Sequence, residues 1–212
     1  MLALSENQVQ FYHSEGYLLV SGLIPREIVE AGTEAMLGYH KAPSQNPAQY
    51  DPALTACYTP AILAAAAQLV GDPVETFRAP EQAFPIITNP SEGEWNWFEP
   101  HIDHSIKADG FNTFPSPFRI ASMLFLSDVA PHGGGTVVWA KSQSKLRALA
   151  ESDKTRFEKV WDLNLAMNEV NIGEPLELTP KAGDILFYDF LLAHSGSKNI
   201  TKVPRLGMNR KW

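Results

Sequence analysis

The character of the sequence changes at Pro73, and this change restricts the folds that the chain can adopt. Beyond it, Pro and Gly separate short segments in which apolar and polar side chains alternate, the pattern of antiparallel strands. About six to eight such strands fit a jelly roll, whose two sheets enclose a pocket. The segments expected to contain strands are Phe77–Thr88, Phe118–Val129, Gly135–Ala140, Glu174–Leu178, Asp184–Phe190 and Arg205–Trp212.

Ahead of Pro73 the chain is expected to be mostly helical. Ser5 is suited to cap a first helix that ends at Gly16, and Pro25 to begin a second. A third helix is predicted over Pro60–Val70, a short strand over Tyr17–Val20 and a Pro-rich loop over Lys41–Asp51. We therefore expect one domain over residues 1–212, with a helical leader at 1–73, a jelly-roll core at 74–212 and a helical insertion at about 142–167.

The composition excludes several classes of protein. With 44% hydrophobic and 19% charged residues, the chain is not an extended disordered protein. Its net charge of −7 argues against nucleic acid or an anionic membrane as the main partner. The single cysteine, Cys57, excludes an intrachain disulfide and is expected to be a small buried apolar residue. No segment is long and apolar enough for a membrane span or resembles a signal peptide, so we expect a cytoplasmic protein. The sequence leaves the oligomeric state open, and a homodimer is compatible with it.

Three residues have the types and order of a metal site. In a strand, residues i and i+2 point to one face, so His101 and Asp103 would present an imidazole and a carboxylate together. His194 follows a turn and an aromatic strand far downstream. Two imidazoles and one carboxylate on one side of a metal leave three positions open, which suits non-haem Fe(II) binding a co-substrate and O₂. Arg205 could then pair with the distal carboxylate of a chelating keto acid.

Four segments carry a resemblance to a known family. They are LSENQVQFYHSEGYLLVSGLIPREIV, HID, LFLSDVAPHGGGTVVWAKSQSK and LTPKAGDILFYDFLLAHSGSKNITKVPR. Together they resemble the phytanoyl-CoA dioxygenase family of Fe(II)- and 2-oxoglutarate-dependent oxygenases, over nearly the whole chain. The resemblance implies a double-stranded β-helix of the cupin type, with His101, Asp103 and His194 as iron ligands. It also implies that Arg205 binds the C5 carboxylate of 2-oxoglutarate.

The chain departs from the family pattern in two places. Many relatives carry Lys on the strand before HxD where this chain has Thr88, and the usual Pro-Gly-Ser-His is replaced by Trp139–Ser142. We take Thr88 and Thr136 as candidate co-substrate contacts. The candidate substrate contacts are Gln82, Phe84, Ile86, Trp97 and His104.

The function predicted from these residues is hydroxylation, or another oxidation, of an unactivated C–H bond, with Fe(II), 2-oxoglutarate and O₂ and with release of succinate and CO₂. The presence of Asp103 argues against halogenation, because halogenating relatives lack this carboxylate. Few basic residues precede the ligand segment, so we expect a small metabolite or natural-product intermediate rather than a coenzyme A thioester. Two alternatives are a cupin-like metal-dependent isomerase or lyase, which would not require Arg205, and a non-catalytic binding protein.

Overall fold

Two antiparallel sheets form the centre of the molecule. The computed structural model describes residues 4–41 and 50–212. The larger sheet has the order β1-β6-β3-β8-β2, and the smaller has the order β5-β4-β7. Among the described residues the two sheets do not close into a barrel. The larger sheet consists of β1 (Tyr17–Val20), β6 (Ile185–Tyr188), β3 (Ala121–Phe125), β8 (Arg205–Lys211) and β2 (Pro85–Thr88); the smaller consists of β5 (Pro175–Glu177), β4 (Val137–Trp139) and β7 (His194–Ser195).

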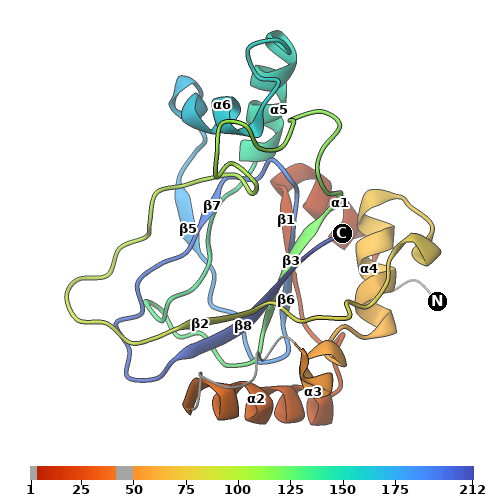
Figure 1. The fold of residues 1–212 in the computed structure, drawn as a ribbon, viewed down its shortest axis with the longest axis vertical. Helices are drawn as coiled ribbons and strands as arrows, with labels where there is room; N and C mark the ends of the chain where they lie inside the picture. The colour runs from red at the N-terminus through yellow and green to blue at the C-terminus, as the bar shows by residue number, and fades with distance from the viewer. Residues whose placement is uncertain (1–3, 42–49) are drawn as a thin grey trace.

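Helices cover one face and one end of this structure. In Figure 1, α2 and α3 run below the sheets, α4 lies beside them, and α5 and α6 lie at the opposite end from α2. The prediction of a mainly β fold with N-terminal helices is confirmed. The helical elements are α1 (Glu6–Glu15), α2 (Arg26–Lys41), α3 (Pro52–Thr55), α4 (Pro60–Val70), η2 (Val74–Thr76), α5 (Ser142–Ser152), α6 (Val160–Leu165) and η3 (Met167–Glu169).

The helix boundaries follow the capping residues. The Ser5 side chain accepts from the Gln8 backbone in a capping box, and Gly16 ends α1 with φ +83°. The Thr59 side chain caps α4 by accepting from the Ile62 amide, and Pro60 occupies the first turn of that helix. The Pro-rich loop predicted over Lys41–Asp51 falls largely outside the described residues, and α3, which follows it, was not predicted.

The strands are shorter than the sequence predicts. For example, the expected strand Phe77–Thr88 contains only β2, and Phe118–Val129 contains only β3. The other residues of these two segments form bends and irregular backbone instead of a continuous ladder. Side-chain alternation therefore overestimates strand length, because loop residues such as Phe77 and Ala83 are buried as well without belonging to a strand.

The larger sheet separates two apolar cores. On one face, residues such as Leu124, Phe187 and Met208 pack with the leader helices. On the other face, residues such as Phe125 and Leu186 pack with the smaller sheet and α5. Cys57 is fully buried in the first core, and burial raises the pKa of its thiol to about 11, as expected for a structural cysteine. Among the described residues, no helix has the length and hydropathy needed to cross a lipid bilayer.

Candidate active site

The two histidines of the predicted trio are joined through their backbones. The His101 amide donates to the His194 carbonyl, and the His194 amide donates to the His101 carbonyl, each over 3.0 Å. Their ring centroids are 4.7 Å apart. Asp103 Oδ2 lies 3.9 Å from His194 Nε2, and one ligand atom from each of the three residues lies within 4.8 Å of the others. The structure therefore brings His101, Asp103 and His194 together.

The segment that carries two of these residues is not a strand, contrary to the prediction. His101 forms an isolated bridge and Asp103 lies in a turn. The intervening Ile102 is fully buried in the core, and its amide donates to Asn164 Oδ1 of α6 over 2.9 Å. Burial of Ile102 and this contact with α6 hold the segment so that His101 and Asp103 both line the cavity.

The His194 imidazole is set up as a neutral ligand. Burial lowers its pKa, although the nearby Asp103 carboxylate opposes this effect. Its Nδ1 lies 3.0 Å from the Leu192 carbonyl oxygen, which can only accept a hydrogen bond. The ring proton therefore resides on Nδ1, and the Nε2 lone pair faces Asp103.

The Asp103 carboxylate is held at both oxygens. Lys211 Nζ lies 2.9 Å from Oδ1, and the Tyr188 hydroxyl donates to Oδ2 over 2.9 Å. Asn209 Nδ2 in turn donates to the Tyr188 hydroxyl over 2.9 Å. Burial by itself would raise the pKa of Asp103, but His194, Lys211 and Tyr188 together lower it below its ordinary value. The group is thus an ionised carboxylate at neutral pH.

Arg205 is a buried cation at the same cavity. Its Nη2 donates to Thr88 Oγ1 over 2.8 Å, its Nη1 lies 3.7 Å from Met123 Sδ, and its Nε has no hydrogen-bond partner. No carboxylate of the described residues lies within ion-pairing distance of it. Burial lowers its pKa to about 10, so the guanidinium stays charged at neutral pH. A buried charge without a counter-ion is costly, and the site is therefore suited to an anion that enters the cavity.

The loop before β8 fixes Thr88 relative to Arg205. The Asn199 side chain is buried, and its Nδ2 donates to the Thr88 carbonyl over 3.0 Å and to the Val203 carbonyl over 2.8 Å. β2 and β8 are paired neighbours, with Thr88 opposite Arg205. Figure 1 shows these two strands running side by side across the front of the molecule. The guanidinium is thus held by a strand pair and not by a free loop.

One cavity of about 260 Å³ joins the trio to Arg205. Of the other predicted contacts, Phe84, Ile86 and Thr136 line it. Thr88 reaches the site only through its hydrogen bond to Arg205. The remaining lining residues are Met123, Tyr188, Ser195, Gly196, Asn209 and Lys211.

Three residues predicted as substrate contacts lie outside this cavity. Gln82 precedes β2, so the alternation of side chains along a strand, from which its position was predicted, does not extend to it. Its side-chain amide donates to the Tyr50 hydroxyl. The Trp97 ring packs against Trp95 and Trp139. His104 has a left-handed backbone, φ +66°, and its ring packs against Phe111 and Phe118. The structure does not bring these three side chains into the cavity with the trio, and their contact with a substrate stays a prediction.

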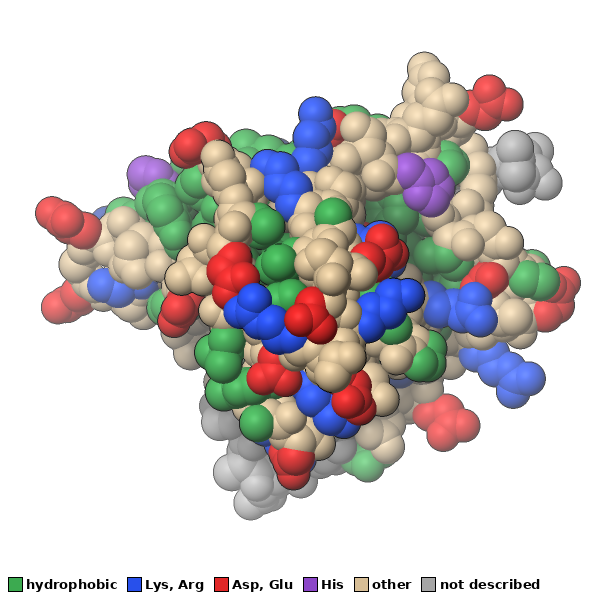
Figure 2. All heavy atoms as spheres, turned by 90° about the horizontal axis from the view of Figure 1, so that it is seen from above, with side chains coloured by type: hydrophobic (Ala, Val, Ile, Leu, Met, Phe, Trp, Pro, Cys, Tyr) green, Lys and Arg blue, Asp and Glu red, His purple; other side chains and the backbone are tan. Residues whose placement is uncertain are grey.

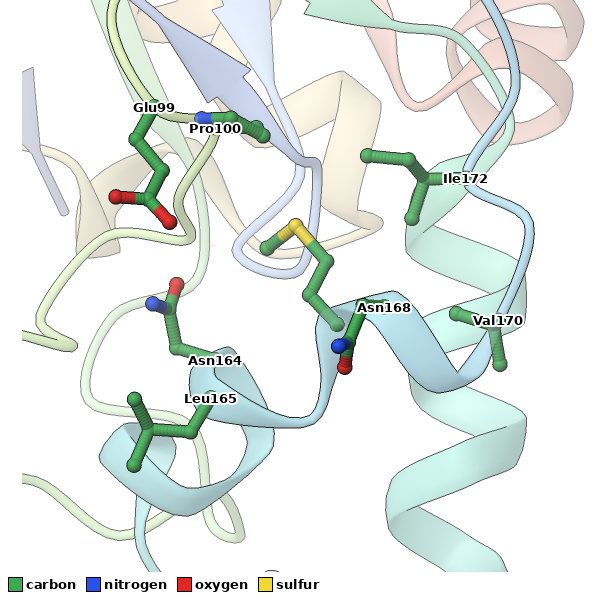
Figure 3. A pocket seen from close by; sticks show the side chains of 8 residues that line it. Glu99, Pro100, Asn164, Leu165, Asn168, Val170 and Ile172 are labelled. Carbon is green, nitrogen blue, oxygen red and sulfur yellow. The ribbon is translucent and has the colours of Figure 1, made fainter.

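A second cavity, of about 280 Å³, lies beside the ligand segment without reaching the trio. Figure 3 shows Glu99 and Asn164 on one side of it and Val170 and Ile172 on the other. Pro100, Leu165, Met167 and Asn168 complete its lining. Neither the two histidines of the trio nor Arg205 lines this second cavity, so the residues suited to bind a metal and an anion lie together in the first cavity.

The donor set of the first cavity fits a divalent transition metal. Two imidazoles and one ionised carboxylate are ligands that Fe(II) accepts, and three protein ligands leave coordination positions for other molecules. The partnerless Nε and the buried charge of Arg205 fit the distal carboxylate of 2-oxoglutarate. The residues present therefore suit both groups.

Comparison with known proteins places the chain among oxygenases of this type. The sequence profile of the family described as phytanoyl-CoA dioxygenase matches residues 12–207. A search of curated protein sequences found no match.

Solved structures share the fold at low sequence identity. The carbocyclase SnoK, a non-haem α-ketoglutarate-dependent enzyme of nogalamycin biosynthesis, is 15% identical with a TM-score of 0.67, covering 99% of this chain and 84% of its own. EctD from S. alaskensis, solved with 2-oxoglutarate and 5-hydroxyectoine, is 14% identical with a TM-score of 0.63, covering 98% and 75%. HygX from Streptomyces hygroscopicus, solved with nickel and 2-oxoglutarate, is 17% identical with a TM-score of 0.64, covering 97% and 85%. The chain belongs to the phytanoyl-CoA dioxygenase family of non-haem Fe(II)- and 2-oxoglutarate-dependent enzymes.

Proposed function

We propose that this enzyme hydroxylates an unactivated C–H bond of a small free metabolite or natural-product intermediate. 2-Oxoglutarate and O₂ are its co-substrates, and succinate and CO₂ its other products. The observation that carries the proposal is a single cavity that contains the His101, Asp103 and His194 cluster together with the buried, unpaired guanidinium of Arg205.

In this proposal His101, Asp103 and His194 are the metal ligands. A bound Fe(II) would supply the activation of O₂ that the oxidative decarboxylation of 2-oxoglutarate and the attack on a C–H bond require. The backbone bridge between His101 and His194 fixes the spacing of the two imidazoles. The three side chains therefore need little rearrangement to bind a metal, which favours tight and specific ligation.

Arg205 is proposed to bind the distal carboxylate of 2-oxoglutarate. Nη1 and Nε have no oxygen partner among the described residues, and Nη2 has a second N–H besides the one that it donates to Thr88. A carboxylate can therefore form a bidentate pair with Nη2 and one of the other two nitrogens. Thr88 thus positions the guanidinium, and Thr136 is a neighbouring contact for the co-substrate. An isomerase or lyase without a keto acid would leave the Arg205 charge unpaired.

The substrate is proposed to be small and to contact an apolar wall. Phe84 and Ile86 line the cavity, and Phe84 is largely exposed. The cationic residues that line it, Arg205 and Lys211, are each assigned to another group, so they are not available for the phosphates of coenzyme A. On the face that carries α5 and α6, Figure 2 shows Lys and Arg interspersed with Asp and Glu rather than gathered in a basic patch. A free small molecule therefore fits better than a coenzyme A thioester.

The cytoplasmic location and the homodimer stay predictions. Neither is needed for the chemistry proposed, since the four functional side chains come from one chain.

Anaerobic reconstitution tests the proposed function. Addition of Fe(II) and then 2-oxoglutarate to the purified protein is expected to produce a weak visible charge-transfer band, which a substrate perturbs. His194→Ala should abolish the band, because it removes one of the two imidazole ligands, and an exposed substitution such as Lys154→Ala should leave it unchanged. Candidate metabolites are then screened for coupled succinate formation. Absence of the band and of 2-oxoglutarate-dependent succinate release would refute the proposal, and preference for a coenzyme A thioester over its free acid would refute the substrate class.

A further inference from the structure

Asp103 has two oxygens with different surroundings. Oδ2 faces His194 Nε2 at 3.9 Å and accepts from the Tyr188 hydroxyl. Oδ1 is 2.9 Å from Lys211 Nζ. Since Oδ2 is the oxygen near His194 Nε2 and Oδ1 is occupied by Lys211, a metal bound between the three residues would meet Oδ2 first.

The Tyr188 contact is itself oriented by a neighbour. Asn209 Nδ2 donates to the Tyr188 hydroxyl oxygen, which leaves the single hydroxyl proton for Asp103 Oδ2. Asn209 and Lys211 are on the same face of β8 as Arg205, because side chains two residues apart in a strand point the same way. β8 thus supplies both groups that set the position of the carboxylate, one directly and one through Tyr188.

The orientation of a carboxylate decides how many coordination positions it occupies. A carboxylate that binds a metal through both oxygens takes two positions, and through one oxygen it takes one. With two histidines, one-oxygen binding leaves three of six positions open, whereas two-oxygen binding leaves two. A chelating keto acid and O₂ together need three.

We propose that Lys211 is a positioning residue that holds Asp103 Oδ1 away from the metal and so keeps open a coordination position that 2-oxoglutarate needs. The inference rests on the proposed function. The role proposed for Lys211 is neither to bind the substrate nor to stabilise the fold. Lys211 is suited to this task because its ammonium is partly shielded and contacts Oδ1, whereas Oδ2 is the oxygen near His194 Nε2.

Substitution with Co(II) as the metal provides the test, because Co(II) requires no exclusion of oxygen for binding and its visible spectrum reports coordination. In Lys211→Met, the affinity for Co(II) is expected to stay within about threefold of wild type or to rise, since a nearby positive charge is removed. The affinity of the Co(II)-loaded protein for 2-oxoglutarate should fall about tenfold or more. The Co(II) spectrum without 2-oxoglutarate should change as Oδ1 joins the metal.

One further variant separates the effect of the position of Oδ1 from the effect of the Lys211 charge, and another serves as a control. Lys211→Gln keeps a hydrogen-bond donor for Oδ1 without the charge, so it should keep most of the 2-oxoglutarate affinity. It also provides the readout if Lys211→Met does not fold. Lys181→Met is the matched control, because Lys181 and Asp128 form a Lys–Asp pair of similar length, 3.0 Å, on the surface. This control should change neither affinity.

The outcomes distinguish the two proposals. Wild-type 2-oxoglutarate affinity and an unchanged Co(II) spectrum in Lys211→Met would overturn the role of Lys211 alone. Equal loss of 2-oxoglutarate affinity in the Gln and Met variants, with unchanged spectra, would also overturn it, since charge alone would then be responsible. A wild-type protein that binds neither Co(II) nor 2-oxoglutarate would overturn the proposed function itself.

Discussion

The two faces of β8 differ in what they bury. On one face Arg205, Asn209 and Lys211 line the cavity and provide polar contacts to Thr88, Tyr188 and Asp103. On the other face Leu206 and Met208 are buried in the core beneath the leader helices. Buried apolar groups stabilise a fold, whereas a buried charge without a partner costs free energy. Along β8, residues that line the cavity therefore alternate with residues that stabilise the fold.

Among the variants that test this difference between the two faces of β8, Arg205→Met is expected to have the largest effect. Loss of the guanidinium should lower the affinity of the metal-loaded protein for 2-oxoglutarate at least about 100-fold, since truncation of a buried ionic contact costs several kcal/mol. The unfolding midpoint of the ligand-free protein should not fall, because an unpaired buried charge is replaced by an apolar side chain. Calorimetric titration and thermal unfolding measure the two quantities. A less stable variant with normal 2-oxoglutarate binding would reverse the roles of the faces.

Met208→Ala should have the opposite profile. Met208 is fully buried, and truncation to Ala is expected to reduce the free energy of unfolding by about 2–5 kcal/mol. In the folded protein the affinity for 2-oxoglutarate should stay within about twofold of wild type. Urea unfolding together with ligand titration well below the unfolding temperature tests this. A large loss of 2-oxoglutarate affinity in the folded variant would show that the two faces are coupled.

Gly207→Ala tests the cavity face at its tightest point. A Cβ at Gly207 would lie 3.0 Å from the Leu124 carbonyl oxygen and 3.1 Å from Arg205 Nη1. Since backbone yields less than a side chain, the guanidinium should shift, and the affinity for 2-oxoglutarate should fall about tenfold. Gly38→Ala in α2 is the control, because its Cβ would meet nothing within 4 Å. Equal 2-oxoglutarate binding by both variants would contradict this prediction.

Thr88→Val is expected to give the smallest effect. The variant keeps the shape of the side chain but removes the acceptor for Arg205 Nη2. In the variant the bound carboxylate of 2-oxoglutarate can itself accept from Nη2 and so offset part of the lost hydrogen bond. We therefore expect 2-oxoglutarate to bind only about a few-fold to tenfold more weakly. Titration at several salt concentrations measures the change. Unaltered affinity would mean that β8 alone positions Arg205.

The sequence predicts the trio and Arg205 better than it predicts their surroundings. His101, Asp103 and His194 carry a chemical pattern that is visible in the chain itself, and the structure brings them together. The expected strand at His101 was wrong because its backbone pairs only with the other histidine and then turns. Gln82, Trp97 and His104 lie outside the cavity because their positions depend on local turns and on aromatic packing that no periodicity reveals.

The contacts to Asp103 were missed for a different reason. Tyr188 lies in an apolar aromatic segment that is typical of core strands, and its partner Asp103 is 85 residues away in the chain. A signal did exist for the other two residues. Counting in steps of two from Arg205 along the predicted strand places Asn209 and Lys211 on the same face as the guanidinium. That inference requires the knowledge that this face lines the cavity, which comes from the folded chain.

The position of β8 in the larger sheet has a consequence during protein synthesis. β8 follows every other described strand in the sequence, yet it lies between β3 and β2. Thr88 and Arg205 are 117 residues apart, so at typical ribosomal rates β2 waits on the order of ten seconds for its neighbour in the sheet. A nascent chain therefore presents the edges of β2 and β3 unpaired until β8 has been synthesised, and insertion of β8 joins β2 to the rest of the sheet and brings Arg205 opposite Thr88.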